Sequence, residues 1–346
     1  MSEPWAIRRA TRASQFALIV VALAFAALCL GPLWLDRNGL RLASEFLVYL
    51  SLASLWNLLA GYAGLVSVGQ QAYVGLGGYV LFAWATLLGL PPLLAVPAAG
   101  VAGALAAFAV SFLVFRLRGA YFAIGSWVVA EVFMLVAAQI SALGGGSGVS
   151  LPIAAVRAIG ATRDARDAAV FLTTLAVSAT ALLAVYLLLR SRWGLALQAI
   201  RDNETAARSS GVRVETVKRL VYVGACCGAA MLGAAIFLAK LRISPSAAFS
   251  VNDWTAFVIF ITVIGGVGRL EGPLVGTALF FLLRENLSFL GAWYLLILGV
   301  IAVLVMLFAP RGLWGLVADR LQQDLLPIGR RLVFARDAAS SKPKEI

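Results

Sequence analysis

Apolar runs long enough to cross a bilayer constrain the fold of this chain more than any other feature of its sequence. A spanning helix needs about 20 mostly apolar residues, because the hydrocarbon core is about 30 Å thick and each residue rises about 1.5 Å. Ten such runs cover approximately residues 16–34, 42–60, 65–90, 93–115, 121–142, 169–189, 220–241, 249–264, 274–290 and 293–308. The sequence therefore predicts an all-α, polytopic membrane protein with about ten transmembrane helices.

The composition agrees with a membrane domain and leaves no stretch for a soluble one. Charged residues make up 13% of the 346 residues, whereas soluble domains contain about 25%. The 3 cysteines lie in apolar runs and histidine is absent, so neither a disulfide framework nor the usual zinc or haem ligands are expected. The net charge of +12 comes mainly from Lys and Arg in short loops, which argues against nucleic acid as a partner. We expect membrane lipid around the chain and no cofactor bound to it.

The distribution of Lys and Arg predicts the side of the membrane on which each loop lies. Positively charged loops tend to stay in the cytoplasm, and with ten spans most basic residues fall on the side of the N-terminus. Both termini are therefore predicted to be cytoplasmic. The chain divides into a cytoplasmic N-terminal segment at residues 1–15, a transmembrane domain at 16–310 and a cytoplasmic tail at 311–346. Within the domain, residues 190–219 form a long cytoplasmic loop.

This cytoplasmic loop contains a short helix with recognisable ends. Asp202 and Asn203 offer side-chain oxygens to cap a helix that begins near Glu204. An acid in the first turn suits the positive end of the helix dipole, and Gly211 is placed to end the helix in a left-handed conformation. Alanines between these ends allow a partner to approach closely. We therefore predict that the helix docks a cytoplasmic protein; the alternative is an ordinary positively charged loop.

The same short helix carries a motif of a known class of transporter. The pattern E-x-A-A-x-x-x-G, formed by Glu204, Ala206, Ala207 and Gly211, resembles the coupling-helix motif of ATP-binding-cassette importer permeases. The usual motif has the acid directly before the two alanines, whereas Thr205 stands between them here.

The resemblance extends over nearly the whole chain. Five segments occur in the order seen in LivM-type permeases of branched-chain amino-acid importers: NLLAGYAGLVSVGQQAYVGLGGY from Asn57, GGGSGVSLP from Gly144, RDNETAARSSGV from Arg201, GGVGRLEGPLVG from Gly265 and FAPRGLWGL from Phe308. Each glycine-rich piece is weak evidence alone, but five in register are specific. The chain is thus similar to a LivM-type permease subunit.

That resemblance implies the function and the partners. A LivM-type chain has the importer permease fold, lies in the bacterial inner membrane and pairs with a LivH-type permease and two ATPase subunits that use ATP and Mg²⁺. An extracytoplasmic binding protein delivers leucine, isoleucine or valine, although related permeases carry urea, amides or other amino acids. This chain has no G-x-x-x-x-G-K-[ST] phosphate loop of its own, so it is not expected to be an enzyme.

Glu131, Arg284 and Glu285 lie deep inside predicted spans. A charged residue at the bilayer centre costs about 2.5–3.5 kcal/mol on insertion scales, so Glu131, Arg284 and Glu285 should face protein or water. Adjacent helical residues diverge by about 100°, so Arg284 is predicted to pair with Glu131 rather than Glu285. The pair is either structural or part of the translocation path. A rival function is a stand-alone secondary transporter in which Glu131 and Glu285 bind protons or sodium; a membrane-embedded enzyme is a weaker third.

Two further groups are candidates for contact with solute or partners. The glycines of the third run make a broken or re-entrant helix plausible, where polar side chains would contact an amino-acid zwitterion; they are Asn57, Ser67, Gln70, Gln71 and Tyr73. Close helix packing is the alternative role of those glycines. In the predicted outer loop, the binding protein would meet Gly145, Gly146, Ser147 and Gly148. A flexible connection is the alternative there.

Overall fold

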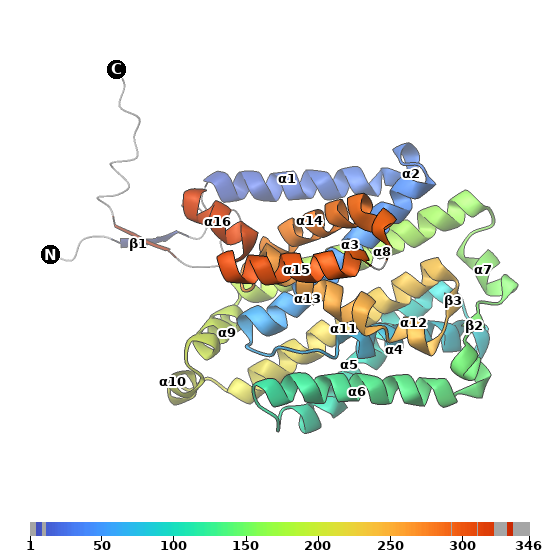
Figure 1. Ribbon diagram of the computed structural model, residues 1–346, viewed down its shortest axis with the longest axis horizontal. Coiled ribbons are helices and arrows are strands. Elements are labelled where there is room, and N and C mark those ends of the chain that lie inside the picture. The colour runs from blue at the N-terminus through green and yellow to red at the C-terminus, as the bar shows by residue number, and fades with distance from the viewer. Residues whose placement is uncertain (1–4, 9–11, 292, 310, 322–330, 335–346) are drawn as a thin grey trace, which may run out of the picture.

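Long helices lying side by side form the body of the molecule in the computed structural model, which describes residues 5–8, 12–291, 293–309, 311–321 and 331–334 (Figure 1). These helices are α1 (Arg12–Cys29), α3 (Arg37–Asn57), α4 (Gln70–Thr86), α5 (Ala95–Val114), α6 (Ala120–Gln139), α8 (Arg163–Arg190), α11 (Val214–Lys240), α13 (Phe257–Gly265), α14 (Gly272–Leu287) and α15 (Trp293–Phe308). Within the described residues, 7 helical segments are long and apolar enough to cross a membrane. The predicted all-α, polytopic fold is confirmed.

The other predicted spans lie on shorter helices. They fall on α1, α4 and α14, which contain 18, 17 and 16 residues. The run at 249–264 begins with a π-helical turn, η5 (Asn252–Ala256), that leads into α13. The total of ten spans and the cytoplasmic side of the termini stay predictions.

Short elements gather at the two ends of the bundle. One end carries α9 (Arg192–Asp202), α10 (Glu204–Ser209), α16 (Gly312–Leu321) and the strands β1 (Trp5–Arg8) and β4 (Arg331–Phe334) (Figure 1). The opposite end carries α2 (Gly31–Trp34), α7 (Ile153–Ile159), α12 (Pro245–Ala248), β2 (Val149–Ser150) and β3 (Arg242–Ile243). Single turns complete the list: η1 (Leu58–Tyr62), η2 (Pro92–Leu94), η3 (Ser141–Leu143), η4 (Gly145–Ser147) and η6 (Ser288–Leu290).

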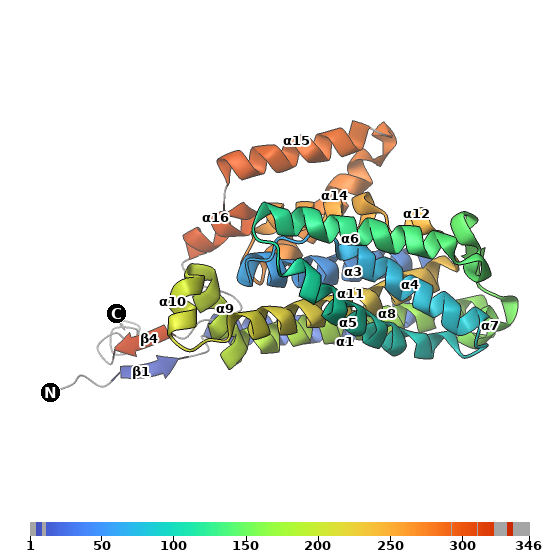
Figure 2. The ribbon, with the colours of Figure 1, turned by 90° about the horizontal axis from the view of Figure 1, so that it is seen from below.

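The segments near the two termini pair with each other. Strands β1 and β4 are antiparallel, with Trp5 opposite Phe334 and Arg8 opposite Arg331. The pair lies at the same end of the bundle as α9 and α10, as Figure 2 also shows. Two chain ends on one side agree with an even number of crossings. The rest of the predicted terminal segments, at 1–4, 9–11, 322–330 and 335–346, lies outside the described residues.

The centre of the bundle depends on close backbone contact between α4 and α11. Helix α11 packs against α4, α5 and α8. A methyl group added at Gly77 would collide with the carbonyl oxygen of Ala230, and one at Gly233 with that of Val74. Small residues let membrane helices approach in this way. Packing, the alternative that the sequence left open for the glycines of the third run, accounts for Gly77.

Candidate functional site

A break in regular structure separates α3 from α4 and brings polar groups together. The chain leaves α3 through the π-helical η1 and has no helical hydrogen bonding at residues 63–69. Helix α4 then runs without interruption past its glycines, so the break precedes them. Trp56 Nε1 donates to Ser67 O at 2.7 Å, and Gln70 Nε2 donates to Leu52 O at 3.1 Å. These bonds hold the irregular segment against α3.

The predicted path residues at this break are buried and largely occupied by protein partners. Asn57, Ser67, Gln70, Gln71 and Tyr73 are all buried. Gln71 accepts a short hydrogen bond from the Thr255 hydroxyl, and Tyr73 OH lies 2.8 Å from Tyr222 OH. Within the described chain, Gln70 Oε1 and Gln71 Nε2 have no partner. Contact of these residues with a solute stays a prediction, with those two amide atoms as the groups still available.

Asn57 links the break to a loop far along the chain. Its Nδ2 donates to Arg269 O at 2.8 Å, and its Oδ1 accepts from Gly268 N at 2.7 Å. Both bonds end on the connection between α13 and α14. The Asn57 amide therefore acts in this structure as a clamp between α3 and that loop, which sequence reasoning did not foresee because the partners are 211 and 212 residues away.

We expect the Asn57→Ala substitution to destabilise the folded chain. It would leave the Gly268 amide and the Arg269 carbonyl without their partner, and each buried polar group left unpaired costs about 1–3 kcal/mol. Asn57→Asp keeps the acceptor for Gly268, so its melting temperature should lie between those of the wild type and Asn57→Ala. Thermal unfolding of the purified chain in detergent measures the difference. Equal melting temperatures for all three proteins would show that the clamp contributes nothing.

The predicted pairing of Arg284 with Glu131 is wrong. Arg284 Nη1 instead lies 3.1 Å from Glu45 Oε2, and Arg41 Nε lies 3.2 Å from Glu45 Oε1. Glu131 accepts from Trp127 Nε1 at 3.0 Å, one turn away on α6. The reason is packing: α14 lies against α3, which carries Glu45. A signal was present, since Glu45 is the only charged residue in the run at 42–60.

Glu285 points elsewhere than its neighbour. It is exposed on α14, whereas Arg284 is half-buried. The divergence of adjacent helical residues, expected from the sequence, is therefore seen. A role for Glu131 or Glu285 in translocation stays a prediction.

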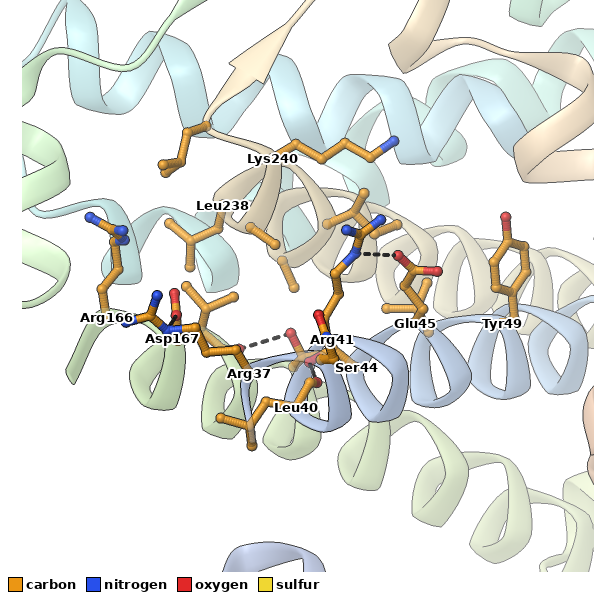
Figure 3. A pocket seen from close by; sticks show the side chains of 18 of the residues that line it. Arg37, Leu40, Arg41, Ser44, Glu45, Tyr49, Arg166, Asp167, Leu238 and Lys240 are labelled. Carbon is orange, nitrogen blue, oxygen red and sulfur yellow. Dashed lines mark hydrogen bonds and ion pairs between the residues drawn. The ribbon is translucent and has the colours of Figure 1, made fainter. Parts of the chain in front are cut away.

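An open cavity of about 580 Å³ lies at the bundle end that carries α7 and β3. Its walls come from the N-terminal halves of α3 and α8, the C-terminal ends of α11 and α14, and η5. Figure 3 shows Arg41 and Glu45 on one wall and Lys240 on the facing one. In the predicted topology this end is extracytoplasmic. Sequence reasoning missed the cavity because its walls come from five separate segments.

The predicted outer loop is ordered against this same end. Gly144, Gly145 and Gly148 all have positive φ, at 82°, 51° and 79°, a region that glycine enters without steric cost. β2 follows directly and pairs with β3. Gly146 has open space around it, and Ser147 is exposed. Binding-protein contact at Gly145, Gly146, Ser147 and Gly148 stays a prediction.

At the opposite end, the short helix that the sequence predicts in the loop at 190–219 forms as expected. Asn203 Oδ1 accepts from Ala206 N at 3.0 Å and caps α10, and Gly211 follows with a φ of 86°. Ala206 is exposed, whereas Ala207 is buried. Ala207 therefore packs the helix onto its own chain, and Ala206 is the alanine open to a partner.

Glu204 ties α10 to the central helix. Its Oε2 lies 2.7 Å from Lys218 Nζ on α11, and its Oε1 lies 3.4 Å from Arg208 Nη2. The hydrogen bond from Lys218 lowers the pKa of the Glu204 carboxyl below its ordinary value, because it stabilises the charged form. On the preceding helix, α9, the guanidinium of Arg201 lies beside Gly268. The loop thus touches α11 directly and, through α9, the connection that Asn57 clamps.

A comparison with protein families identifies the class of this chain. The family model described as branched-chain amino acid transport system, permease component, matches residues 38–308. The chain belongs to this family. The match includes the break between α3 and α4, the loops at residues 144–148 and 190–219, and every lining residue of the cavity except Arg37.

Individual relatives agree with the family assignment. The permease is 26% identical over 330 residues to the high-affinity branched-chain amino acid transport system permease protein LivM of Salmonella typhimurium, and equally to LivM of Escherichia coli; the alignments cover 88% of this chain and 75% of each relative. The ribose import permease RbsC of Escherichia coli is 30% identical over 131 residues, which is 36% of this chain and 40% of RbsC. No solved structure matches significantly.

These findings confirm the resemblance to LivM-type permeases. The permease is a multi-pass protein of the bacterial inner membrane. Its family and its LivM relatives are permease components, which are transport subunits.

Proposed function

We propose that this permease is a membrane subunit of an ATP-driven importer that carries leucine, isoleucine and valine into the cell. The observation that carries the proposal is the similarity to LivM along 88% of the chain, which includes the capped helix α10. The C-terminal residues of that helix and its exposed Ala206 offer a small, ordered surface at the end where β1 and β4 lie.

The partners in this proposal supply what the chain lacks. Two ATPase subunits, which bind ATP and Mg²⁺, dock on the loop at residues 190–219, which serves as the coupling loop. A LivH-type permease completes the path through the membrane. A solute-binding protein delivers the amino acid at the opposite end, where the outer loop and the cavity lie.

The contacts of the coupling loop indicate how ATPase closure would act on the membrane part. A push on α10 reaches α11 through the ion pair of Glu204 with Lys218. The same push reaches the connection between α13 and α14 through Arg201, which lies beside Gly268. Asn57 passes that movement to the break between α3 and α4. Both routes use packed or hydrogen-bonded contacts, which are the physical basis of coupling between distant sites.

Transport by the reconstituted complex tests the proposed function. The permease is co-expressed with the second permease and the ATPases from its own gene neighbourhood, placed in proteoliposomes and supplied with its binding protein. We expect leucine uptake that requires ATP and is competed by isoleucine and valine. Uptake by this chain alone, driven by a proton or sodium gradient, would instead support a secondary transporter. Competition by urea or amides but not by leucine would contradict the proposed substrate.

A further inference from the structure

The outer cavity combines charged groups with an apolar wall. Buried aliphatic side chains line part of it, among them Leu40, Val170 and Leu238. Its volume of about 580 Å³ falls in the range of small-molecule sites, about 300–1,000 Å³. A cavity of this kind can hold the apolar part of a solute and orient it by a few polar contacts.

Most of the charges around the cavity already neutralise one another. Arg37 lies 2.7 Å from Asp164 and 3.5 Å from Asp167. Glu45 holds Arg41 through one carboxylate oxygen and Arg284 through the other. These groups stiffen the rim and are not free to bind a charged ligand strongly.

Two opposite charges, Lys240 and Asp253, are among the lining residues that have no such partner. Among the described residues, neither Lys240 nor Asp253 makes an ion pair within 4.0 Å. The Lys240 ammonium instead lies 4.8 Å from the ring centroid of Trp254, and 5.5 Å from that of Phe237. The aromatic rings hold the side chain in place while its hydrogen-bond donors stay open. Figure 3 shows Lys240 on the opposite side of the cavity from Arg41 and Glu45.

Asp253 supplies the second charge in the lining of the same cavity. It precedes Trp254 in η5, where its own backbone amide donates to Ser250 Oγ at 3.2 Å. Arg166 is the other charged lining residue without an ion pair among the described residues, and it lies at the far side of the cavity from Lys240 (Figure 3). One open ammonium, against the Trp254 ring, and one open carboxylate therefore line the same cavity.

We propose that this cavity binds a zwitterionic α-amino acid, with Lys240 on its carboxylate, Asp253 on its ammonium group and the aliphatic wall around its side chain. A simple anion would be repelled by Asp253, and a simple cation by Lys240. A zwitterion satisfies both groups at once, and hydrogen bonds between charged partners are the strong ones. The assignment rests on the proposed function and gives it a solute site within this chain, separate from the break between α3 and α4.

The position of Lys240 links the site to the cytoplasmic end. Lys240 is the last residue of α11, and Lys218 near the start of the same helix holds Glu204 of α10. One continuous helix thus carries both the solute-binding ammonium and the contact with the coupling loop. A shift of α11 caused by the ATPases would move Lys240 away from Asp253 and release the amino acid.

Binding of radiolabelled leucine to the assembled importer in nanodiscs, without the binding protein and without ATP, tests the site. We expect saturable binding that Lys240→Met and Asp253→Asn each weaken on the order of tenfold, the effect of one lost charged hydrogen bond. Lys240→Arg should retain part of the affinity. Leucinamide, which lacks the carboxylate, and 4-methylpentanoate, which lacks the amine, should compete poorly. The Arg157→Gln substitution, on exposed α7 at the same end, is the control and should bind leucine as the wild type does.

Two results would overturn the assignment. One is wild-type affinity in both Lys240→Met and Asp253→Asn, with both variants eluting as folded complexes in gel filtration. The other is no leucine binding by a wild-type complex that still imports leucine with ATP, which leaves the proposed function intact. Conversely, leucine binding that depends on both residues in a complex that imports none supports the site and contradicts the proposed function.

Discussion

The Ala206→Arg substitution is expected to abolish ATP-dependent uptake while the permease still folds and inserts. Ala206 is exposed on α10, and its side chain points away from the chain's own core. An arginine there adds a long charged group to a surface that is proposed to fit closely against an ATPase, and clashes of this kind oppose binding strongly. We expect at least a tenfold loss of leucine uptake in proteoliposomes and loss of the ATPases during co-purification, on the order of 1.4 kcal/mol or more in affinity.

Two matched variants distinguish a loss of ATPase docking from a loss of folding stability. Ala207→Arg puts the same side chain at a buried position, so it should also lower the melting temperature of the isolated permease. Ala161→Arg places it at an exposed site before α8, at the other end of the bundle, and should leave ATPase retention unchanged. Normal retention of the ATPases by Ala206→Arg would show that α10 is not their docking element.

The Gly77→Leu substitution is expected to prevent correct packing of the bundle. A single added carbon at Gly77 meets the backbone carbonyl of Ala230, and backbone cannot turn aside as a flexible side chain can. Overpacking a core lowers the stability of the fold by about 1–3 kcal/mol and sometimes more. Here α4 would have to move away from α11. We expect aggregated protein in gel filtration and little permease in the membrane fraction.

A glycine on the partner helix provides the control. Gly224 lies on α11 with open space where its side chain would be, so Gly224→Leu should express and elute like the wild type. It tests whether any glycine-to-leucine change in this region is harmful. A monodisperse Gly77→Leu protein with wild-type stability would show that α4 and α11 do not meet as closely as the structure has them.

Much of the candidate site followed from local sequence. The cap at Asn203, the helix start at Glu204 and the left-handed Gly211 were predicted correctly, because each depends on hydrogen bonds within a few residues. The exposure of Ala206 and the burial of Ala207 were not predicted, since they depend on how α10 lies against α9 and α11. Capping is a property of the segment, whereas burial is a property of its neighbours.

Charged pairs inside the bundle show the same division. The sequence predicted a pair of Arg284 and Glu131 because a charged side chain in lipid needs a partner. Arg284 does have a carboxylate partner. The actual partner, Glu45, lies 239 residues from Arg284, and only the packing of α14 on α3 brings them together. Similarly, the bonds of the Asn57 amide to the connection between α13 and α14 join residues 211 and 212 positions apart, and local sequence does not predict them.

The sequence by itself determined the all-α membrane class, the approximate position of each apolar helix, the capped helix α10 and the resemblance to LivM-type permeases. Apolar length and capping are local quantities that can be read along one segment. Only the tertiary structure decided which helices meet, and therefore the pairing of Glu45 with Arg284, the clamp at Asn57 and the cavity beside Lys240 and Asp253. Those features depend on the relative rotation and depth of several helices, which in lipid are set by close side-chain packing rather than by hydrophobic pattern.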